Sequence, residues 1–424
     1  MIHIAARVPD PPVRRLTTTL YGYAFLSDLV LLYPLYVVFF ADTGLSVGQI
    51  SSLFVIWSAA GLLFEVPSGA WADVVSRRLL LCLAPLVTAT GYALWVWLPS
   101  YPAFAVGFLL WGAGGALVSG ALEALVWTEL DRLGAVGRYA RVLGRARTAG
   151  VLGAVVSGVL AGPVFAVGGY PAVAVASVLA CLLAAVVAAR FPEHRPPAAE
   201  PTRPTSERDD DDGDLGWWET LRAGLTQVRT RPPVRAAVLL VAVVAADWGA
   251  LDEYTPLLAL DTGVGARAVP LLLLLLWAGV TVGGLLAPVG ERLRHRGYAA
   301  LLGLVGVALA GGALLRHPGG FVLLAVAFGA AQLATVLADA RLQARIVGTS
   351  RATVTSLAGM VTDLLIIGTY AGYGLVATAA GDAVAFAVTA GPYLVMGLVL
   401  LCRRRRGAAA PTLSTASVVG GPGR

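Results

Sequence analysis

Charged residues are scarce in this sequence. They make up 13% of its 424 residues, whereas soluble globular domains carry about one quarter. A surface that faces water needs charges to cover it, so this scarcity argues against a soluble multidomain enzyme. The rest of the composition agrees, because 58% of the residues are hydrophobic and the mean hydropathy is +0.78. A bilayer-spanning helix needs roughly 20 apolar residues, and this content suffices for about twelve of them.

Cysteine, histidine and lysine are also rare or missing. The three cysteines, Cys82, Cys181 and Cys402, lie far apart in apolar runs, which excludes a disulfide scaffold and the Cys-x-x-Cys spacing of many metal sites. The four histidines all lie in predicted loops or tails. Since none lies within a predicted span, carboxyl groups must carry any proton coupling. No lysine occurs, so all 31 basic residues are arginines.

Apolar runs separated by short polar breaks predict an all-α integral membrane protein with twelve transmembrane helices. The first six run at about 17–41, 47–70, 79–98, 102–127, 140–166 and 171–190. The second six run at about 235–260, 268–290, 298–315, 319–340, 353–377 and 382–402. Glycine and proline inside these runs do not argue against helices, because neighbouring helices can satisfy the freed backbone groups.

The arginines predict the orientation of the spans. With both termini on one side, 29 of the 31 arginines fall on that side, and only Arg267 and Arg316 fall on the other. Cytoplasmic loops of membrane proteins carry an excess of arginine and lysine. We therefore expect a multi-pass protein of the inner (cytoplasmic) membrane with both termini in the cytoplasm.

The chain divides into five predicted parts. They are a cytoplasmic tail at 1–16, a six-helix bundle at 17–190, a linker at 191–234, a second six-helix bundle at 235–402 and a tail at 403–424. The linker is rich in proline and contains Asp209 to Asp212. Nothing fixes the geometry of these aspartates as a metal site would require, so we interpret them as part of a solvated segment.

The end of the linker has a helical pattern. Trp217, Trp218, Leu221, Leu225 and Val228 recur at helical spacing, with arginines between them. Apolar residues on one face and arginines on the other are typical of a helix lying on a membrane surface. We therefore expect a short amphipathic helix on the cytoplasmic surface of the membrane.

The two predicted bundles contain an internal repeat. Asp28 is followed by Asp42-Thr43-Gly44, and Asp247 is followed at the same spacing by Asp261-Thr262-Gly263. One offset, close to half the length of the chain, relates both parts of the pattern. Repeated halves are typical of secondary transporters, which bind their substrate near mid-membrane between the halves.

One loop motif suggests a family. Residues 69–78 read Gly-Ala-Trp-Ala-Asp-Val-Val-Ser-Arg-Arg, between the second and third predicted spans. Gly69, Asp73, Arg77 and Arg78 stand at the fixed positions of Gly-x-x-x-Asp-x-x-(Gly/Ser)-Arg-(Lys/Arg). This resembles the loop signature of the major facilitator superfamily. The resemblance implies two pseudo-symmetric six-helix bundles around a central cavity, lined mainly by helices 1, 4, 7 and 10.

The same motif predicts a conformational gate. A glycine lets the second helix pack closely, and an aspartate at a helix end can accept hydrogen bonds from the start of the next helix. Arg77 and Arg78 can then pair with Glu129 and Asp131 beneath the fourth span. Such a charge cluster would hold the two halves in the outward-open state.

The resemblance is strongest to bacterial efflux members, but it has gaps. Drug/proton antiporters of the superfamily usually carry an arginine in helix 4, and residues 108–115 contain none. Their helix 5 signature is only partly matched, by Gly158, Gly162 and Pro163. Export by proton antiport therefore follows from the family resemblance rather than from these motifs.

Acidic residues within the spans are the candidates for proton coupling or substrate binding. A charged residue at a span centre costs roughly 2.5–3.5 kcal/mol on insertion scales, so these side chains should face the protein interior. Removal from water disfavours the charged carboxylate, so such a group can bind and release protons or hold a cation. The candidates are Asp28, Glu65, Glu123, Asp247, Asp252, Glu253 and Asp363. Each could instead serve as a structural hydrogen-bond partner.

Aromatic residues are expected to supply walls of the same cavity. The candidates are Tyr23, Tyr33, Tyr36, Trp57, Trp111, Trp127, Tyr254 and Tyr370. Ordinary packing, or a place in the aromatic belt at the membrane surface, is the alternative for each of them. The predicted cavity lining is acidic and aromatic, which suits a neutral or cationic substrate.

The sequence thus favours a secondary active transporter that exports a small amphipathic molecule, neutral or cationic, by proton antiport with alternating access. Its expected partners are this substrate, protons and the lipid bilayer, with no nucleic acid, and we expect a monomer. The proton gradient takes the place of a cofactor, and no metal is expected. A proton-coupled uptake symporter for a metabolite is the first alternative. A polytopic membrane transferase is the second, although the predicted external loops are short.

Overall fold

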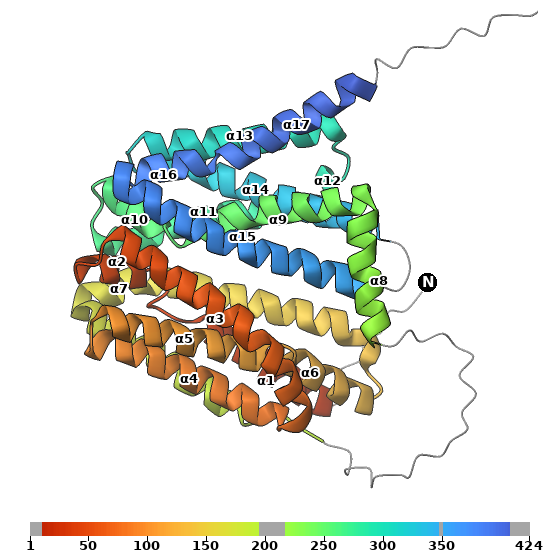
Figure 1. Cartoon of the computed structure of the whole chain (residues 1–424). Helices are drawn as coiled ribbons and strands as arrows, with labels where there is room; N and C mark the ends of the chain where they lie inside the picture. The colour runs from red at the N-terminus through yellow and green to blue at the C-terminus, as the bar shows by residue number, and fades with distance from the viewer. Residues whose placement is uncertain (1–10, 195–216, 347–350, 408–424) are drawn as a thin grey trace, which may run out of the picture.

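The computed structural model describes residues 11–194, 217–346 and 351–407. Within these ranges the chain is helical and contains no strand (Figure 1). The helices lie side by side in two bundles, one from each half of the sequence (Figure 1). The predicted all-α membrane fold is therefore confirmed.

The first bundle is built from the described residues up to 194. Its helices are α1 (Pro11–Asp28), α2 (Tyr36–Asp42), α3 (Val47–Val74), α4 (Arg77–Trp97), α5 (Tyr101–Val118), α6 (Ala121–Arg132), the short 3-10 helix η1 (Val136–Arg138) and α7 (Tyr139–Ala188). Helix α7 is sharply bent at Gly168 and Gly169, and Gly169 has a φ of 61°. Glycine adopts this left-handed conformation without steric cost. The bend divides α7 into two membrane crossings.

The second half is built from the described residues after 216. Its helices are α8 (Trp217–Thr230), α9 (Pro232–Asp252), α10 (Thr255–Asp261), the 3-10 helix η2 (Ala266–Ala268), α11 (Val269–Leu285), α12 (Ala287–Gly290), α13 (His295–Leu314), α14 (Gly320–Gln343), α15 (Arg351–Ala380), α16 (Asp382–Thr389) and α17 (Gly391–Gly407). Helix α8 stands apart from the others, since it runs across one end of the bundles (Figure 1).

Ten stretches of the described residues are long and apolar enough to cross a membrane. One of them, 136–188, has 53 residues and contains the bend of α7, so it crosses twice. The first predicted span is not among the ten, because α1 and α2 are separate helices. With these two adjustments the structure agrees with twelve spans.

The first and seventh predicted spans are not continuous helices. Residues 29–35 separate α1 from α2, and Glu253 and Tyr254 separate α9 from α10. Pro34 lies in the first break, and proline both lacks an N–H and clashes with the preceding helical turn. Pro256 lies in the first turn of α10, where proline is well tolerated. Both spans are therefore interrupted at the same level of the bundle.

The internal repeat is present in the structure. Helices α2 and α10 have seven residues each and occupy matching places in the two halves. Each is followed by a threonine whose hydroxyl donates to a helix carbonyl at 2.7 Å. Gly44 and Gly263 come next, with φ values of 88° and 85°. The two Asp-Thr-Gly segments therefore end equivalent helices in the same way.

The two halves pack against each other at one end of the molecule. We call the end formed by α2, α10 and α16 the closed end, and the opposite end, with the loops at 75–76, 133–138 and 291–294, the arginine-rich end (Figure 1). Residues of both halves share one hydrophobic core that includes the closed end. At the arginine-rich end the described residues form separate cores for the two halves, around Leu16 and Leu125 in one and Val234 and Leu342 in the other.

Close contacts between the halves also lie towards the closed end. A Cβ added to Gly374 on α15 would meet Ser51 on α3 at 2.6 Å. One added to Gly162 on α7 would meet the carbonyl oxygen of Arg267 at 2.7 Å. Glycine lets these backbones approach closely, as it does in many membrane helix pairs.

Candidate functional site

A cavity of about 990 Å³ lies between the halves. This volume is at the upper end of the range for small-molecule sites. Most of the wall comes from the first half, and α9 and α11 of the second half complete it. Its charged and aromatic lining residues are Tyr23, Asp28, Tyr33, Trp57, Tyr92, Trp111, Arg147, Asp252 and Trp277.

Asp28 is the acid of the first half that reaches the cavity. It is the last residue of α1, whereas the sequence predicts the middle of a continuous helix. Its side chain is exposed, and the space it faces is the cavity. A Cβ added to Gly150 of α7 would collide with the Asp28 carboxyl oxygen Oδ2. The glycine therefore makes room for this carboxyl group beside α7.

Asp252 and Glu253 lie next to each other at the break between α9 and α10. Asp252 lines the cavity. Glu253 is buried and accepts a hydrogen bond from the hydroxyl of Tyr36, which begins α2. This pair connects the two halves. The structure therefore places one of these predicted acids in the cavity wall and the other in the contact between halves.

Tyr36 and Tyr254 do not line the cavity, contrary to the sequence prediction. They are 1% and 0% exposed, and both lie in contacts between the halves. The Tyr254 hydroxyl donates to the Ser51 hydroxyl at 2.8 Å. Four of the predicted aromatics do line the cavity, namely Tyr23, Tyr33, Trp57 and Trp111.

Asp247 occupies a different environment from its repeat partner Asp28. It is 8% exposed and does not line the cavity. The hydroxyl of Thr369 on α15 donates to its Oδ1 at 3.0 Å. Its Oδ2 is buried and has no hydrogen-bond partner among the described residues. A buried polar atom without a hydrogen-bond partner costs free energy of folding. The Asp247 carboxyl group is therefore only partly satisfied within the second bundle.

The remaining predicted acids that the structure describes lie away from the cavity. Glu123 is in the first turn of α6, where a negative charge interacts favourably with the helix dipole. Asp363 is half-buried on α15. The side chain of Glu65 lies outside the described residues. Of the six predicted acids whose side chains the structure describes, Asp28 and Asp252 line the cavity.

An aromatic cluster forms one wall of the cavity. The rings of Trp57 and Trp111 are stacked with centroids 4.8 Å apart. Tyr33 and Tyr92 contact Trp111 edge-on at 5.4 and 5.6 Å. The faces and edges of such rings can hold an apolar group or a cation.

Three of the charged and aromatic cavity residues lie outside the sequence prediction. Tyr92 and Trp277 carry no distinguishing sequence signal, because aromatic residues are common within the spans. Arg147 lines the cavity one turn along α7 from Gly150, towards the arginine-rich end. The sequence assigns no arginine to the cavity, since the predicted spans hold arginine only near their ends.

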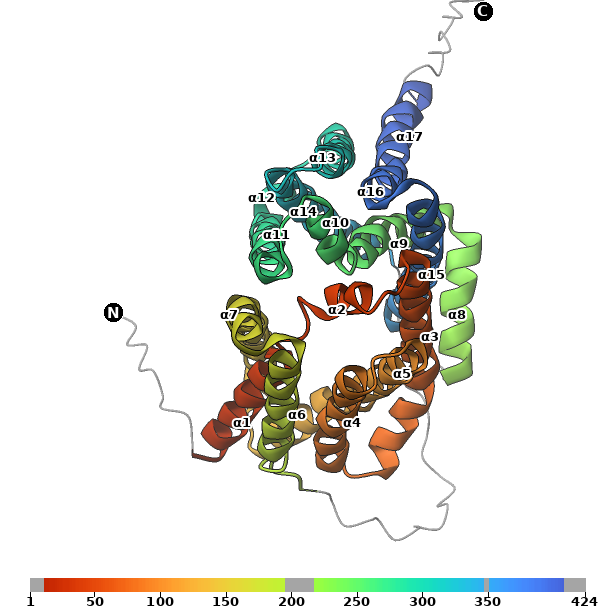
Figure 2. The same ribbon diagram turned by 90° about the vertical axis from the view of Figure 1, so that its left-hand side faces the viewer.

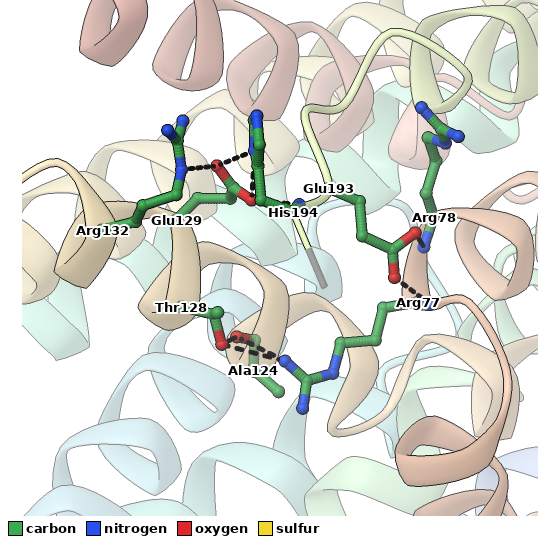
Figure 3. Close-up of polar contacts among 8 residues, drawn as sticks. All are labelled: Arg77, Arg78, Ala124, Thr128, Glu129, Arg132, Glu193 and His194. Atoms are coloured by element: carbon green, nitrogen blue, oxygen red, sulfur yellow. Dashed lines mark hydrogen bonds and ion pairs between the residues drawn. The ribbon is translucent and has the colours of Figure 1, made fainter. Parts of the chain in front are cut away.

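The loop motif at residues 69–78 contributes to a polar cluster at the arginine-rich end (Figure 3). The carboxylate of Glu193 accepts hydrogen bonds from the backbone N–H groups of Arg77 and Arg78 at 2.8 and 3.4 Å. These groups open α4, and a carboxylate is favourable at the start of a helix. The Arg77 guanidinium donates to the Ala124 carbonyl at 3.1 Å and to the Thr128 hydroxyl at 2.9 Å.

The predicted pairing of these arginines with Glu129 and Asp131 is not formed in this conformation. Glu129 is 1% exposed and binds Arg132 at 3.2 Å and the His194 ring at 3.1 Å (Figure 3). It also accepts the His194 backbone N–H at 2.7 Å. Asp131 is exposed. The chain after α7 turns back beneath the bundle, and its residues 193 and 194 provide the partners instead.

This polar cluster lies within one half of the molecule. Its members in Figure 3 come from α4, α6 and the residues after α7, and the contacts drawn there join these elements of the first half. The surroundings of Gly69 and the side chain of Asp73, at the end of α3, lie outside the described residues. The contacts of Glu129 and Glu193 drawn in Figure 3 therefore stabilise the first half, and the predicted latch of the outward-open state by Arg77, Arg78, Glu129 and Asp131 stays a prediction.

Two bundles related by an internal repeat, with a cavity between them, are the architecture of a secondary transporter. The sequence model of the Major Facilitator Superfamily matches residues 19–367, so the chain belongs to this superfamily. It is a membrane transporter and not an enzyme, which removes the transferase alternative. No curated protein matches the sequence.

Solved transporter structures share the fold. A bacterial homologue of the human lysosomal transporter Spinster, in an inward-facing and unoccupied conformation, has a TM-score of 0.70 and 14% identity, covering 94% of this chain and 98% of its own. The nucleoside transporter NupG has a TM-score of 0.69 and 13% identity, covering 93% and 100%. A D-xylose-proton symporter has a TM-score of 0.60 and 15% identity, covering 92% and 96%. At these identities the similarity shows the fold alone.

Proposed function

We propose that this transporter exports a small amphipathic molecule, neutral or cationic, in exchange for protons. The observation that carries the proposal is the cavity, in which the carboxyl groups of Asp28 and Asp252 lie among aromatic rings. Aromatic faces attract cations, and a carboxylate adds charge complementarity. The apolar remainder of the wall suits the body of an amphipathic molecule.

We propose that the arginine-rich end faces the cytoplasm of a cell whose inner membrane holds the protein. The positive-inside rule supports this orientation, and it places both termini in the cytoplasm. The separate cores of the two halves at that end are consistent with a cavity that opens there. A substrate would then enter from the cytoplasm and leave after the closed end separates.

Asp28 is the proposed point of exchange between proton and substrate. Its carboxyl group faces the cavity, and Gly150 leaves it free of contact with an α7 side chain at that position. A proton and a cation that compete for the same carboxylate cannot both occupy it. Binding of either one then biases the equilibrium between the two arrangements of the halves. The proton gradient drives this cycle without a bound cofactor, and a monomer holds the complete cavity.

The test is accumulation of a cationic dye in a bacterial host that lacks its own efflux pumps. We expect the wild-type chain to lower the dye content of the cells and Asp28→Asn to restore it to the level of the empty host. Glu291→Gln is the matched control, because Glu291 is an exposed acid outside the cavity. If no dye or drug responds, and vesicles instead show proton-driven uptake of a metabolite, export is wrong.

Arg147 supports the uptake symporter as the second candidate. This basic side chain lies in the cavity wall, and basic groups suit substrates that carry an acidic group. Uptake would make Arg147→Gln deleterious for transport of an anionic or dipolar metabolite. Export of cations would leave dye efflux by Arg147→Gln intact or improved, so the same variant separates the two candidates.

A further inference from the structure

Helix α8 runs across the arginine-rich end, whereas the helices of the bundles run between the two ends (Figure 1). Seen along the bundle, it lies outside the ring of helices, beside α15 (Figure 2). It packs on α9 and α15. This position does not belong to the cavity, and the transport cycle proposed above does not use it.

The described side chains of α8 divide into two faces. Gln227 is buried, and Val228 packs against the core that contains Val234 and Leu342. That core lies at the ends of α9 and α14, so α8 lies at the level where these spans end. The opposite face is accessible in the described chain.

The accessible face carries positive charge and an apolar residue. Arg222, Leu225, Thr226 and Arg229 are all exposed, and their spacing of three, four and seven positions places them on one side of a helix. Leu225 is 41% exposed. Helices that lie on a membrane surface combine arginines with apolar residues that enter the boundary of the lipid leaflet, and this accessible face carries both.

The positive charge continues beyond the end of α8. Arg231 and Arg235 are exposed in the connection to α9 and its first turn. Together with Arg222 and Arg229 they make four exposed arginines. Among the described residues, ion pairs form at Glu129, with Arg132 and His194, and not at any of these four. Their guanidinium groups therefore have no carboxylate partner within the described chain. Guanidinium groups bind phosphate through paired hydrogen bonds.

We propose that this face of α8, formed by Arg222, Leu225 and Arg229 with Arg231 and Arg235 beside it, binds anionic phospholipid. The phosphates of the lipid headgroups pair with the guanidinium groups, and Leu225 contacts the acyl chains beneath them. Because α8 packs on α9 and α15, bound lipid anchors the second half of the transporter to one leaflet. The inference depends on the membrane location of the chain and not on its substrate.

The test measures thermal unfolding of the purified full-length protein in detergent, with either phosphatidylglycerol or phosphatidylcholine added. A ligand that binds the folded state raises the unfolding temperature. We expect phosphatidylglycerol to raise it by several degrees more than phosphatidylcholine does. The double variant Arg222→Gln/Arg229→Gln should lose more than half of this difference, and Arg222→Lys/Arg229→Lys should keep most of it.

The matched control is Arg141→Gln/Arg145→Gln, which removes two exposed arginines from the first turns of α7 at the same end. This variant should keep the lipid difference. Native mass spectrometry of the same proteins should show fewer retained phosphatidylglycerol molecules for the α8 variant alone. The proposal is wrong if Arg222→Gln/Arg229→Gln and Arg141→Gln/Arg145→Gln lose the difference between the two lipids equally. It is also wrong if both lipids stabilise the wild type equally, or if glycerol phosphate without acyl chains raises the unfolding temperature as much as phosphatidylglycerol does.

Discussion

Two aspartates at matching positions of the repeat have come to occupy unlike surroundings. Asp28 faces the cavity beside Gly150, whereas Asp247 is buried between α9 and α15 with one carboxyl oxygen unpartnered among the described residues. Equivalent backbone positions therefore do not imply equivalent chemistry. Asp28 can meet a substrate directly, and Asp247 can affect transport only through the packing of α15, the helix that contacts α3 of the other half.

The hydrogen bond from Thr369 to Asp247 should contribute measurably to stability. Thr369→Val removes the hydroxyl that donates to this buried carboxyl group. We expect the variant to be destabilised by about 1–3 kcal/mol, because a buried acceptor loses its partner. The control is Thr362→Val on the same helix, whose hydroxyl bonds to the carbonyl of Ala358. Chemical unfolding in detergent measures both, and equal effects would contradict the prediction.

The space opposite Asp28 can be probed through Gly150. The atom that an added Cβ would meet first is the end of the Asp28 side chain. Gly150→Ala should therefore displace the carboxyl group and lower transport several-fold, while the fold remains intact. Gly144→Ala is the control on the same helix, because an added Cβ there meets nothing within 4 Å. Transport assays and unfolding curves of both variants measure this. An equal loss of transport in Gly150→Ala and Gly144→Ala would contradict the prediction.

At the scale of elements, the first bundle is stabilised by the residues that directly follow its last helix, α7. Glu193 caps α4 and His194 binds Glu129 of α6, so two residues after α7 join three elements (Figure 3). These contacts lie within one half. They stabilise the bundle as a unit, which is what a half must be if it is to move as a rigid body.

Removal of the Glu193 carboxylate should loosen the start of α4. Glu193→Ala leaves the N–H groups of Arg77 and Arg78 without this acceptor. We expect a loss of about 0.5–2 kcal/mol, as for other helix caps, and faster amide exchange confined to the first turn of α4. Hydrogen-exchange mass spectrometry measures this. Uniform exchange changes across the bundle, or none, would count against a capping role.

The spans could be predicted because apolar length and arginine placement are local properties of the sequence. The breaks at 29–35 and at Glu253 could not, because a Pro34 within a membrane helix can either kink it or end it, depending on its neighbours. Glu193 was missed because it begins a segment whose later composition is that of a solvated linker. Charge alone favours a pair of Arg77 with Glu129, but in this conformation Glu129 binds Arg132 and His194, while the Arg77 guanidinium binds Ala124 and Thr128.

For the whole molecule, the main asymmetry is between its two ends. The closed end has one core shared by both halves, whereas each core that the described residues form at the arginine-rich end belongs to a single half. Alternating access requires that the closed end opens when the arginine-rich end closes, and the reverse. The contacts at the closed end, among them Tyr254 with Ser51 and Tyr36 with Glu253, must therefore break in each cycle.

A reversible cross-link across the closed end should stop transport. A Cβ added to Gly48 would lie 3.3 Å from the Thr378 hydroxyl oxygen, across the contact between α3 and α15. In a background with Cys82, Cys181 and Cys402 replaced, Gly48→Cys/Thr378→Cys should form a disulfide on oxidation. Transport should fall to background and return on reduction, while each single variant stays active. Full activity of the cross-linked protein would exclude opening at this end.

The separate cores at the arginine-rich end also bear on how the chain folds during synthesis. Every buried member of the first of these cores precedes residue 192, and every buried member of the second follows residue 233. Domains generally fold as units, the N-terminal one first, as the chain leaves the ribosome. The first bundle can thus complete its own core, and Glu193 can cap it, before any buried residue of the second core has been made.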